Sequence, residues 1–240
     1  MAVGSISRQD QQPVFVLHTY PFKETSLVVE LFSRDFGRVA AVAKGARRPR
    51  SAMRGMLQSF QPLLATWSGK SELRNLHSLE WGEGLLLLDG DALMCGFYLN
   101  ELLLRLLPRE DAHEDLFLYY TQTLRVLSAG VDAPSTLRRF ELRLLQQLGY
   151  ALPLVADAQG DGIQPDRLYR YVAERGALPQ GDDQIGVQLS GKTLLDMARE
   201  DYADPVTQQQ SKHLMRMLLA HYLGDKPLYT RQLLMDLQEL

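Results

Sequence analysis

The pattern of apolar and polar positions changes character near Trp81. Before it, short segments rich in β-branched and aromatic residues, separated by Gly, Pro and Asp, predict β-strands. We expect strands at 13–20, 25–33 and 37–46, a short helix within 50–60, and a strand hairpin over 62–81 that turns at 68–70. Five short strands with a helix between the third and fourth match an OB-fold, a Greek-key barrel that often binds single-stranded nucleic acid.

After Trp81 the apolar residues recur with helical spacing. We expect helices at 91–110, 113–130, 134–150 and 204–224, and a last short helix over 230–240. The first is apolar nearly all round, which indicates a buried helix. The fourth has strong end signals, with Asp204 as N-cap, Pro205 at the first helical position and Gly224 just past the end.

These patterns predict an α+β protein, with an N-terminal OB-fold domain at 1–82 and a C-terminal helical domain at 83–240. A small irregular insert, about 151–189, is rich in Gly, Pro and Asp. Within it, LYRYVAERGAL at 168–178 fits either a small hairpin turning at 174–176 or one irregular helical turn.

The composition excludes several classes of protein. No apolar run approaches the roughly 18 residues that cross a bilayer, and the first residues lack the pattern of a signal peptide. The single cysteine, Cys95, excludes an intramolecular disulfide framework and a cysteine-based zinc site. The five histidines have no metal-ligand spacing, and no carboxylates form an evident catalytic pair. We therefore expect a cytoplasmic protein that is not an enzyme and has no metal, cofactor or membrane partner.

One motif argues for an enzyme. Residues 186–193, GVQLSGKT, satisfy the phosphate-loop pattern of nucleotide hydrolases. A working phosphate loop follows a buried strand of a parallel sheet, and the upstream segment is instead polar and Gly-rich. The alternative is an ordinary helix start with Ser190 as N-cap, and we favour this alternative.

Charge divides unevenly along the chain. Residues 1–80 carry 11 Lys and Arg against 6 Asp and Glu, although the whole chain has a net charge of −3. A solvated basic surface is the simplest explanation, but such asymmetry also indicates nucleic-acid contact. The candidate DNA-binding residues are Arg38, Lys44, Arg47, Arg48, Arg50, Arg54 and Trp67, with Tyr20, Phe22 and Phe36 as further aromatics that could stack on bases.

The chain resembles the RecO family of bacterial DNA repair and recombination mediators. The stretch HTYPFKETSLVVELFSRDFGRVAAVAKGARRPRS resembles the family's N-terminal region, and LQSFQPLLATWSGKSELRNLHSLE resembles the strand pair that follows. The segments YLNELLLRLL, LRRFELRLLQQLGY and YLGDKPLYTRQLL resemble its helical signatures. The similarity extends from about Phe15 to Leu234, and it rests on the order and spacing of these segments together.

The resemblance implies a nucleoid-associated protein of the RecF pathway. It implies binding of single- and double-stranded DNA, strand annealing, and, with RecR and in some pathways RecF, loading of RecA onto strands covered by single-strand-binding protein. It matches the basic loop, Lys44 to Arg54, to the family's DNA-binding region. It also matches Arg138, with Leu137 and Leu142 as apolar neighbours, to a position suited to the acidic tail of single-strand-binding protein.

Two points stay open. Some members of the family bind zinc through four cysteines in the region of 151–180, where this chain has none, so we expect no zinc and an insert held by packing alone. The residues also leave an RNA-binding OB module and a protein-interaction adaptor as alternative functions.

Overall fold

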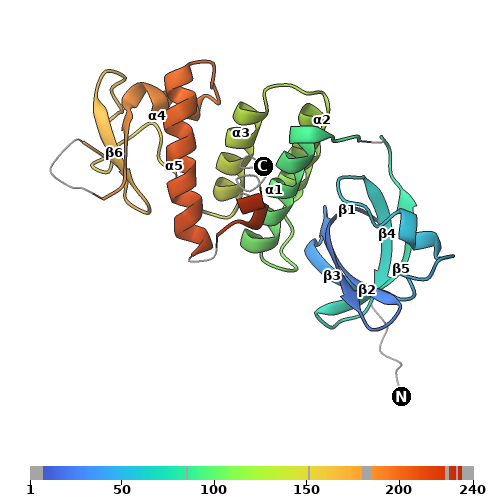
Figure 1. The fold of residues 1–240 in the computed structure, drawn as a ribbon. Helices are drawn as coiled ribbons and strands as arrows, with labels where there is room; N and C mark the ends of the chain where they lie inside the picture. Colours follow the sequence, from blue (N-terminus) through green and yellow to red (C-terminus); the bar gives the residue numbers. More distant parts are fainter. Residues whose placement is uncertain are drawn as a thin grey trace. The chain divides into compact units, whose positions relative to one another are not determined.

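The computed structural model describes residues 8–84, 86–150, 152–179, 185–224, 227–230 and 232–233, and begins with a closed five-stranded barrel (Figure 1). Its strands are β1 Arg8–Phe22, β2 Ser26–Ser33, β3 Gly37–Ala43, β4 Leu63–Ser68 and β5 Leu73–Trp81, in the order β1-β2-β3-β5-β4. Neighbouring strands are antiparallel except β3 and β5. This closed barrel, followed by helices, confirms the predicted fold class.

The barrel interior is apolar because alternate strand residues point inward. On β2, Val29 and Leu31 are fully buried in the barrel core, while Glu30 and Phe32 alternate with them. The short helix expected after β3 is a 3₁₀ turn, η1 Ala52–Gly55, and its Met53 packs against the core together with Met56 and Leu57, which follow it. These side chains anchor the chain to the barrel between β3 and β4.

Two helices follow, α1 Gly90–Leu106 and α2 Glu114–Ser128. Phe15 and Phe32 of the barrel pack against Phe117 of α2, with ring centroids 5.4 Å apart in both pairs. Asn100 of α1 donates its Nδ2–H to the carbonyl oxygen of Leu17 over 3.0 Å. The expectation that α1 is buried all round is wrong on one side, where Phe97 is 41% exposed.

The barrel, α1 and α2, together with the residues from Leu228 onward, form one compact unit, and Asp132–Pro227 form a second. The second unit contains α3 Ala133–Gln147, β6 Leu168–Val172, β7 Gly176–Pro179, β8 Val187–Ser190, α4 Gly191–Ala198 and α5 Pro205–Leu223. This grouping differs from the expected division at 82/83, which stays a prediction.

The insert contains an antiparallel sheet of order β7-β6-β8, so the hairpin alternative for 168–178 is confirmed. Its turn places Glu174 and Gly176 at positive φ, at 64° and 81°. Tyr171 and Leu189 are buried in it, as expected for a subdomain held by packing.

The predicted helix ends are confirmed at α5, where the Asp204 side chain accepts from the Val206 N–H over 2.8 Å and Gly224 has a φ of 69°. Of the short helix expected over 230–240, Thr230 and residues 232–233 are helical, and the remainder lies outside the described residues. Among the described residues, no helix combines the length and apolar character that a membrane crossing requires.

Candidate nucleic-acid interface

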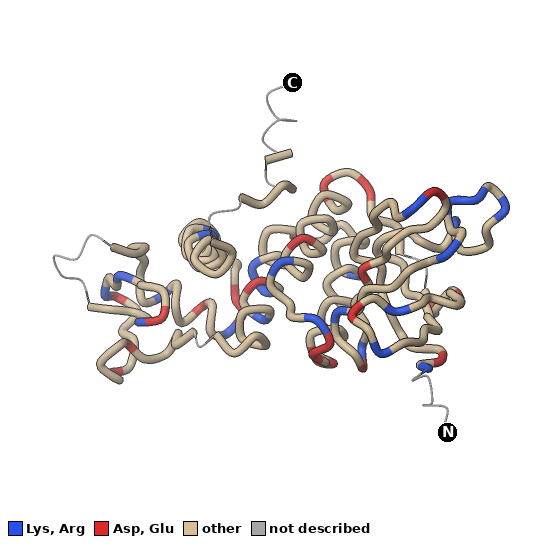
Figure 2. Tube along the Cα trace, turned by 90° about the horizontal axis from the view of Figure 1, so that it is seen from below, with Lys and Arg blue, Asp and Glu red and all other residues tan. Residues whose placement is uncertain are grey.

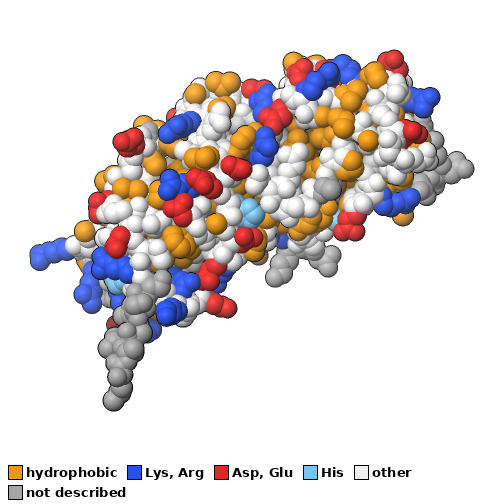
Figure 3. Space-filling model, turned by 180° about the vertical axis from the view of Figure 1, so that it is seen from behind, with side chains coloured by type: hydrophobic (Ala, Val, Ile, Leu, Met, Phe, Trp, Pro, Cys, Tyr) orange, Lys and Arg blue, Asp and Glu red, His pale blue; other side chains and the backbone are white. Residues whose placement is uncertain are grey.

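The basic loop, residues 44–54, leaves the barrel after β3 (Figure 2). Five cationic side chains of this loop are exposed, namely Lys44, Arg47, Arg48, Arg50 and Arg54. Figure 2 shows several Lys and Arg positions close together along one loop of the barrel, and Figure 3 shows Lys and Arg side chains on the surface among other residues. The structure therefore brings five of the seven predicted DNA-binding residues together in one segment.

The loop is fixed to the barrel at its start. The Arg47 N–H donates to the Thr25 carbonyl oxygen over 2.9 Å, and Arg47 Nη1 donates to the Glu24 carbonyl oxygen over 3.3 Å. Between these contacts and β3, Ala46 is fully buried in the barrel core, and Gly45 adopts a φ of 68° that favours glycine. The four arginines therefore lie on a segment that is anchored to the barrel core by Ala46 before them and by Met53 and Met56 on either side of Arg54.

The charge of the loop is not neutralised within the part of the chain that the structure describes. No ion pair there joins Lys44, Arg47, Arg48, Arg50 or Arg54 to an Asp or Glu. Lys23, which the sequence patterns did not single out, is exposed in the β1–β2 turn that the loop contacts, with Nζ 5.3 Å from the Phe22 ring centroid. Guanidinium groups presented in this way can bind phosphates bidentately.

Arg38 lies apart from the loop, on the outer face of β3. Its Nη1 donates to the carbonyl oxygen of Leu104 in α1, and burial lowers the pKa of Arg38. Its electrostatic neighbours are Glu30 and Arg109. Arg38 is therefore engaged with α1 rather than presented with the loop.

Trp67 is also unlike the other candidates, because it is only 2% exposed and belongs to the barrel core. Its ring meets Phe36 edge-on at a centroid distance of 5.6 Å. A ring face that packs in the core is not available to a base. Tyr20, in contrast, is 46% exposed, and its ring meets that of His18 at a centroid distance of 4.4 Å, so its ring is more accessible than that of Trp67.

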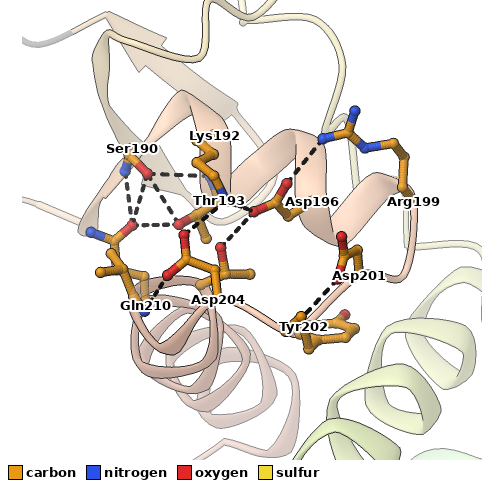
Figure 4. Close-up of polar contacts among 12 residues, drawn as sticks. Ser190, Lys192, Thr193, Asp196, Arg199, Asp201, Tyr202, Asp204 and Gln210 are labelled. Carbon is orange, nitrogen blue, oxygen red and sulfur yellow. Dashed lines mark hydrogen bonds and ion pairs between the residues drawn. The ribbon is translucent and has the colours of Figure 1, made fainter.

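The segment that matches the phosphate-loop pattern is a helix start (Figure 4). Ser190 is the N-cap of α4, and its Oγ accepts from the Thr193 N–H over 3.2 Å. Lys192 is engaged with two carboxylates, at 2.5 Å from Asp196 and 2.8 Å from Asp204. The preceding strand, β8, is antiparallel to β6. Neither the sheet nor the lysine has the arrangement that nucleotide binding requires.

The candidate tail-binding residues lie on α3. Arg138 pairs with Glu141, whose side chain is fully buried, and the Arg138 side chain is itself 14% exposed. Leu142 is buried and Leu137 is half-buried. A carboxylate that approaches Arg138 would therefore compete with an internal one.

Together, an OB-type barrel with an exposed, unneutralised basic loop and an appended helical region define a class of nucleic-acid-binding proteins. The model of the Recombination protein O N-terminal domain matches residues 8–84, and that of the C-terminal domain matches residues 87–232. The chain belongs to the RecO family.

Curated relatives agree with this assignment. The DNA repair protein RecO of Nitrosospira multiformis is 58% identical over 236 residues, covering 97% of this chain and 98% of the relative. The DNA repair protein RecO of Dechloromonas aromatica is 53% identical over 238 residues, covering 98% of each chain. That of Aromatoleum aromaticum is 56% identical over 237 residues, covering 97% of this chain and 98% of the relative.

Proposed function

We propose that this protein is a recombination mediator of the RecF pathway, which binds and anneals DNA strands and, with RecR and in some pathways RecF, helps to load RecA onto strands covered by single-strand-binding protein. Membership of the RecO family, whose curated relatives are named DNA repair proteins, supports a role in DNA repair. The observation that carries the DNA-binding step is the basic loop, with five exposed cations that no described carboxylate neutralises.

Annealing follows from this charge. Two complementary strands repel each other along their phosphates, and a basic surface that binds both lowers the repulsion and concentrates them. Base pairing then supplies the driving force. The phosphate contacts carry no sequence information, so the loop suits strands of any sequence.

Annealing can be followed with two complementary strands of about 30 nucleotides that carry a donor and an acceptor fluorophore. We expect the protein to accelerate pairing at low salt and to lose this effect as salt rises. Replacement of Arg47, Arg48, Arg50 and Arg54 by Ala should remove most of the acceleration. An unchanged annealing rate in that variant would assign DNA binding to another surface.

Recruitment to covered strands is the second step of the proposal. Arg138 binds the terminal carboxylate of the tail of single-strand-binding protein and releases Glu141, with which it forms an ion pair in this structure. Leu137 and Leu142, which are close to Arg138 in the sequence, provide apolar contacts to the tail. Tethering then raises the effective concentration of the basic loop on the strand. If Arg138→Ala binds a synthetic tail peptide as tightly as the parent protein does, this step is wrong.

The alternatives give different outcomes in simple assays. A matched RNA oligonucleotide that displaces the DNA at equal concentration would favour an RNA-binding module. Binding of partner proteins with no measurable affinity for either nucleic acid would favour an adaptor.

A further inference from the structure

The barrel face that binds oligonucleotides in many OB-folds, the outer side of β2 and β3, is covered in this protein. Phe32 of β2 packs against Phe117 of α2, with ring centroids 5.4 Å apart. On the same face, Glu30 pairs with Arg109, and Arg38 is engaged with α1. A DNA strand that binds the barrel must therefore use its loops rather than this face.

The barrel also carries a pocket of about 370 Å³ between the start of β1, the β2–β3 turn and the β4–β5 turn. This volume is near the lower limit for small-molecule pockets, so it suits a single compact group. Phe36 is half-buried, and its ring lies at 84° to that of Trp67, which is only 2% exposed and forms the floor. The lining residues are Gln9, Phe36, Trp67, Gly69, Lys70 and Arg74. The pocket therefore combines an aromatic floor with a cationic rim.

The rim is held in place by Arg74. Its Nη1 donates to the Gly69 carbonyl oxygen over 2.7 Å, and its Nη2 lies 2.5 Å from a Glu110 carboxylate oxygen. These contacts fix the β4–β5 turn and leave the Arg74 side chain 16% exposed. Lys70, the next residue of the turn, is exposed, and it pairs with no Asp or Glu of the described ranges. Lys70 is therefore the cation that a ligand in the pocket would meet.

We propose that this pocket holds one unpaired base of the DNA strand that the basic loop binds, with an adjacent phosphate on Lys70 Nζ, an inference that rests on the proposed function. The base lies against Phe36 and reaches Trp67 at the floor. Every base has a face that can contact an aromatic ring, so the pocket accepts strands of any sequence. A base within a duplex is stacked between its neighbours and paired, so it cannot enter. The pocket therefore favours single strands over duplex.

The position of the pocket fits a strand that also contacts the basic loop. Phe36 directly precedes β3, and Lys44 directly follows it, so the two sites lie at opposite ends of a strand of seven residues. At about 3.3 Å per residue, β3 is about 23 Å long. This length corresponds to about seven nucleotides at roughly 3.4 Å each. Since OB-folds cover about 4 to 16 nucleotides, one strand can reach both sites.

Tryptophan fluorescence tests the proposal, because the chain has two tryptophans and only Trp67 lines the pocket. Trp81→Phe, a change at a 51% exposed position, leaves Trp67 as the single tryptophan. This variant is saturated, as judged by anisotropy, with a strand of about 30 nucleotides or with a strand of equal length that lacks all bases. We expect the intact strand to quench Trp67 emission and the abasic strand to bind without quenching it.

The outcomes separate this proposal from the proposed function. Equal Trp67 emission with the two bound strands would overturn the pocket assignment and leave DNA binding by the basic loop standing. No binding of either strand would overturn both. Base-dependent quenching that persists, at unchanged affinity, in the variant with four loop arginines replaced would support the pocket and contradict the role of the loop.

Phe36→Leu keeps an apolar side chain at the pocket but removes the aromatic ring. We expect it to weaken single-strand binding about fivefold, because stacking on an aromatic ring is lost, and to leave duplex affinity unchanged. Phe97→Leu is the matched control, because Phe97 lies on α1 and does not line this pocket. Equal losses of single-strand and duplex affinity in Phe36→Leu would give this residue a structural role only and contradict the proposal.

Lys70→Ala tests the phosphate contact. The slope of log affinity against log salt for a single strand should be smaller by about 0.7, the value for one contact. Lys212→Ala, which removes the same charge from an exposed position of α5, is the control and should leave the slope unchanged. A slope in Lys70→Ala equal to that of the parent protein would contradict the assignment of a phosphate to Lys70.

Discussion

The backbone N–H of Arg47 donates a 2.9 Å hydrogen bond to the carbonyl oxygen of Thr25, which joins the basic loop to the turn between β1 and β2. Because Ala46, the residue before it, is fully buried in the barrel, the first arginine of the loop has a fixed starting direction. Loops carry function when a rigid scaffold positions them. We therefore expect DNA affinity to depend on the shape of this loop as well as on its charge.

A substitution at Gly45 tests whether the conformation of the basic loop affects DNA binding, because it leaves the charge of the loop unchanged. Its φ of 68° lies in the left-handed region, where a β-branched residue is strongly disfavoured. Gly45→Val should cost about 1–2 kcal/mol of stability and weaken single-strand binding at low salt, although no cation is lost. Gly55→Val is the control, because a Cβ at Gly55 meets nothing within 4 Å. Equal DNA affinities for the two variants would show that the loop's conformation does not matter.

Gly191, the second glycine of the apparent phosphate loop, serves packing in this structure. A Cβ there would lie 1.9 Å from the carbonyl oxygen of Gln164, whereas a Cβ at Gly162 would meet nothing within 4 Å. Gly191→Ala should lower the free energy of unfolding by about 1–3 kcal/mol, and Gly162→Ala should leave it nearly unchanged. Chemical denaturation monitored by circular dichroism compares them. Nucleotide binding that disappears only in Gly191→Ala would revive the phosphate-loop interpretation.

Asp196 links α4 to α5 and predicts a pH dependence. Burial raises its pKa, but hydrogen bonds from Lys192, Thr207 and Arg199 outweigh burial and hold the pKa below its ordinary value of 3.8. A lowered pKa means that the stabilisation is fully present above the unfolded-state value and is lost as the pH falls through the folded-state value.

Asp196→Asn should therefore destabilise the protein by about 2 kcal/mol at neutral pH. The difference between variant and parent should shrink below about pH 4. Urea unfolding at a series of pH values measures this difference. A gap that stays constant down to pH 2 would mean that the carboxylate charge is not what stabilises the contact.

Glu101 holds the C-terminal segment on α1 by accepting three hydrogen bonds from Tyr229 and Thr230. Glu101→Ala should increase hydrogen exchange of the Tyr229 and Thr230 amides by about tenfold or more. Glu114→Ala, a change at an exposed position of α2, is the control. If the amides exchange equally fast in the parent protein, the segment is not held by this carboxylate.

Much of the fold follows from local signals in the sequence. The strands were predictable because β-branched runs end at Gly, Pro and Asp, and α5 because Asp204, Pro205 and Gly224 mark its ends. The exposure of the loop cations was predictable, because this stretch of the sequence contains no Asp or Glu that could pair with them and allow them to be buried.

The positions of Trp67 and Arg38 were not predictable in the same way. The register of β4 against β5 shifts between Thr66 and Trp67, so Ala65, Thr66 and Trp67 are all buried and simple alternation fails. Arg38 bonds to Leu104, 66 residues further along the chain, which depends on how α1 packs on the barrel. Sequence patterns describe local preferences and carry no record of such tertiary contacts.

The central claim is that the basic loop binds single-stranded DNA through its phosphates. Its most direct test is the fluorescence anisotropy of a labelled strand of about 30 nucleotides, titrated at several salt concentrations with the parent protein and with the variant that carries Ala at Arg47, Arg48, Arg50 and Arg54. The slope of log affinity against log salt counts phosphate contacts, at about 0.7 per contact for a single strand. We predict that the variant binds much more weakly at low salt and that its slope is smaller by about 3. Unchanged affinity and slope would contradict the account and leave the loop as a solvated surface.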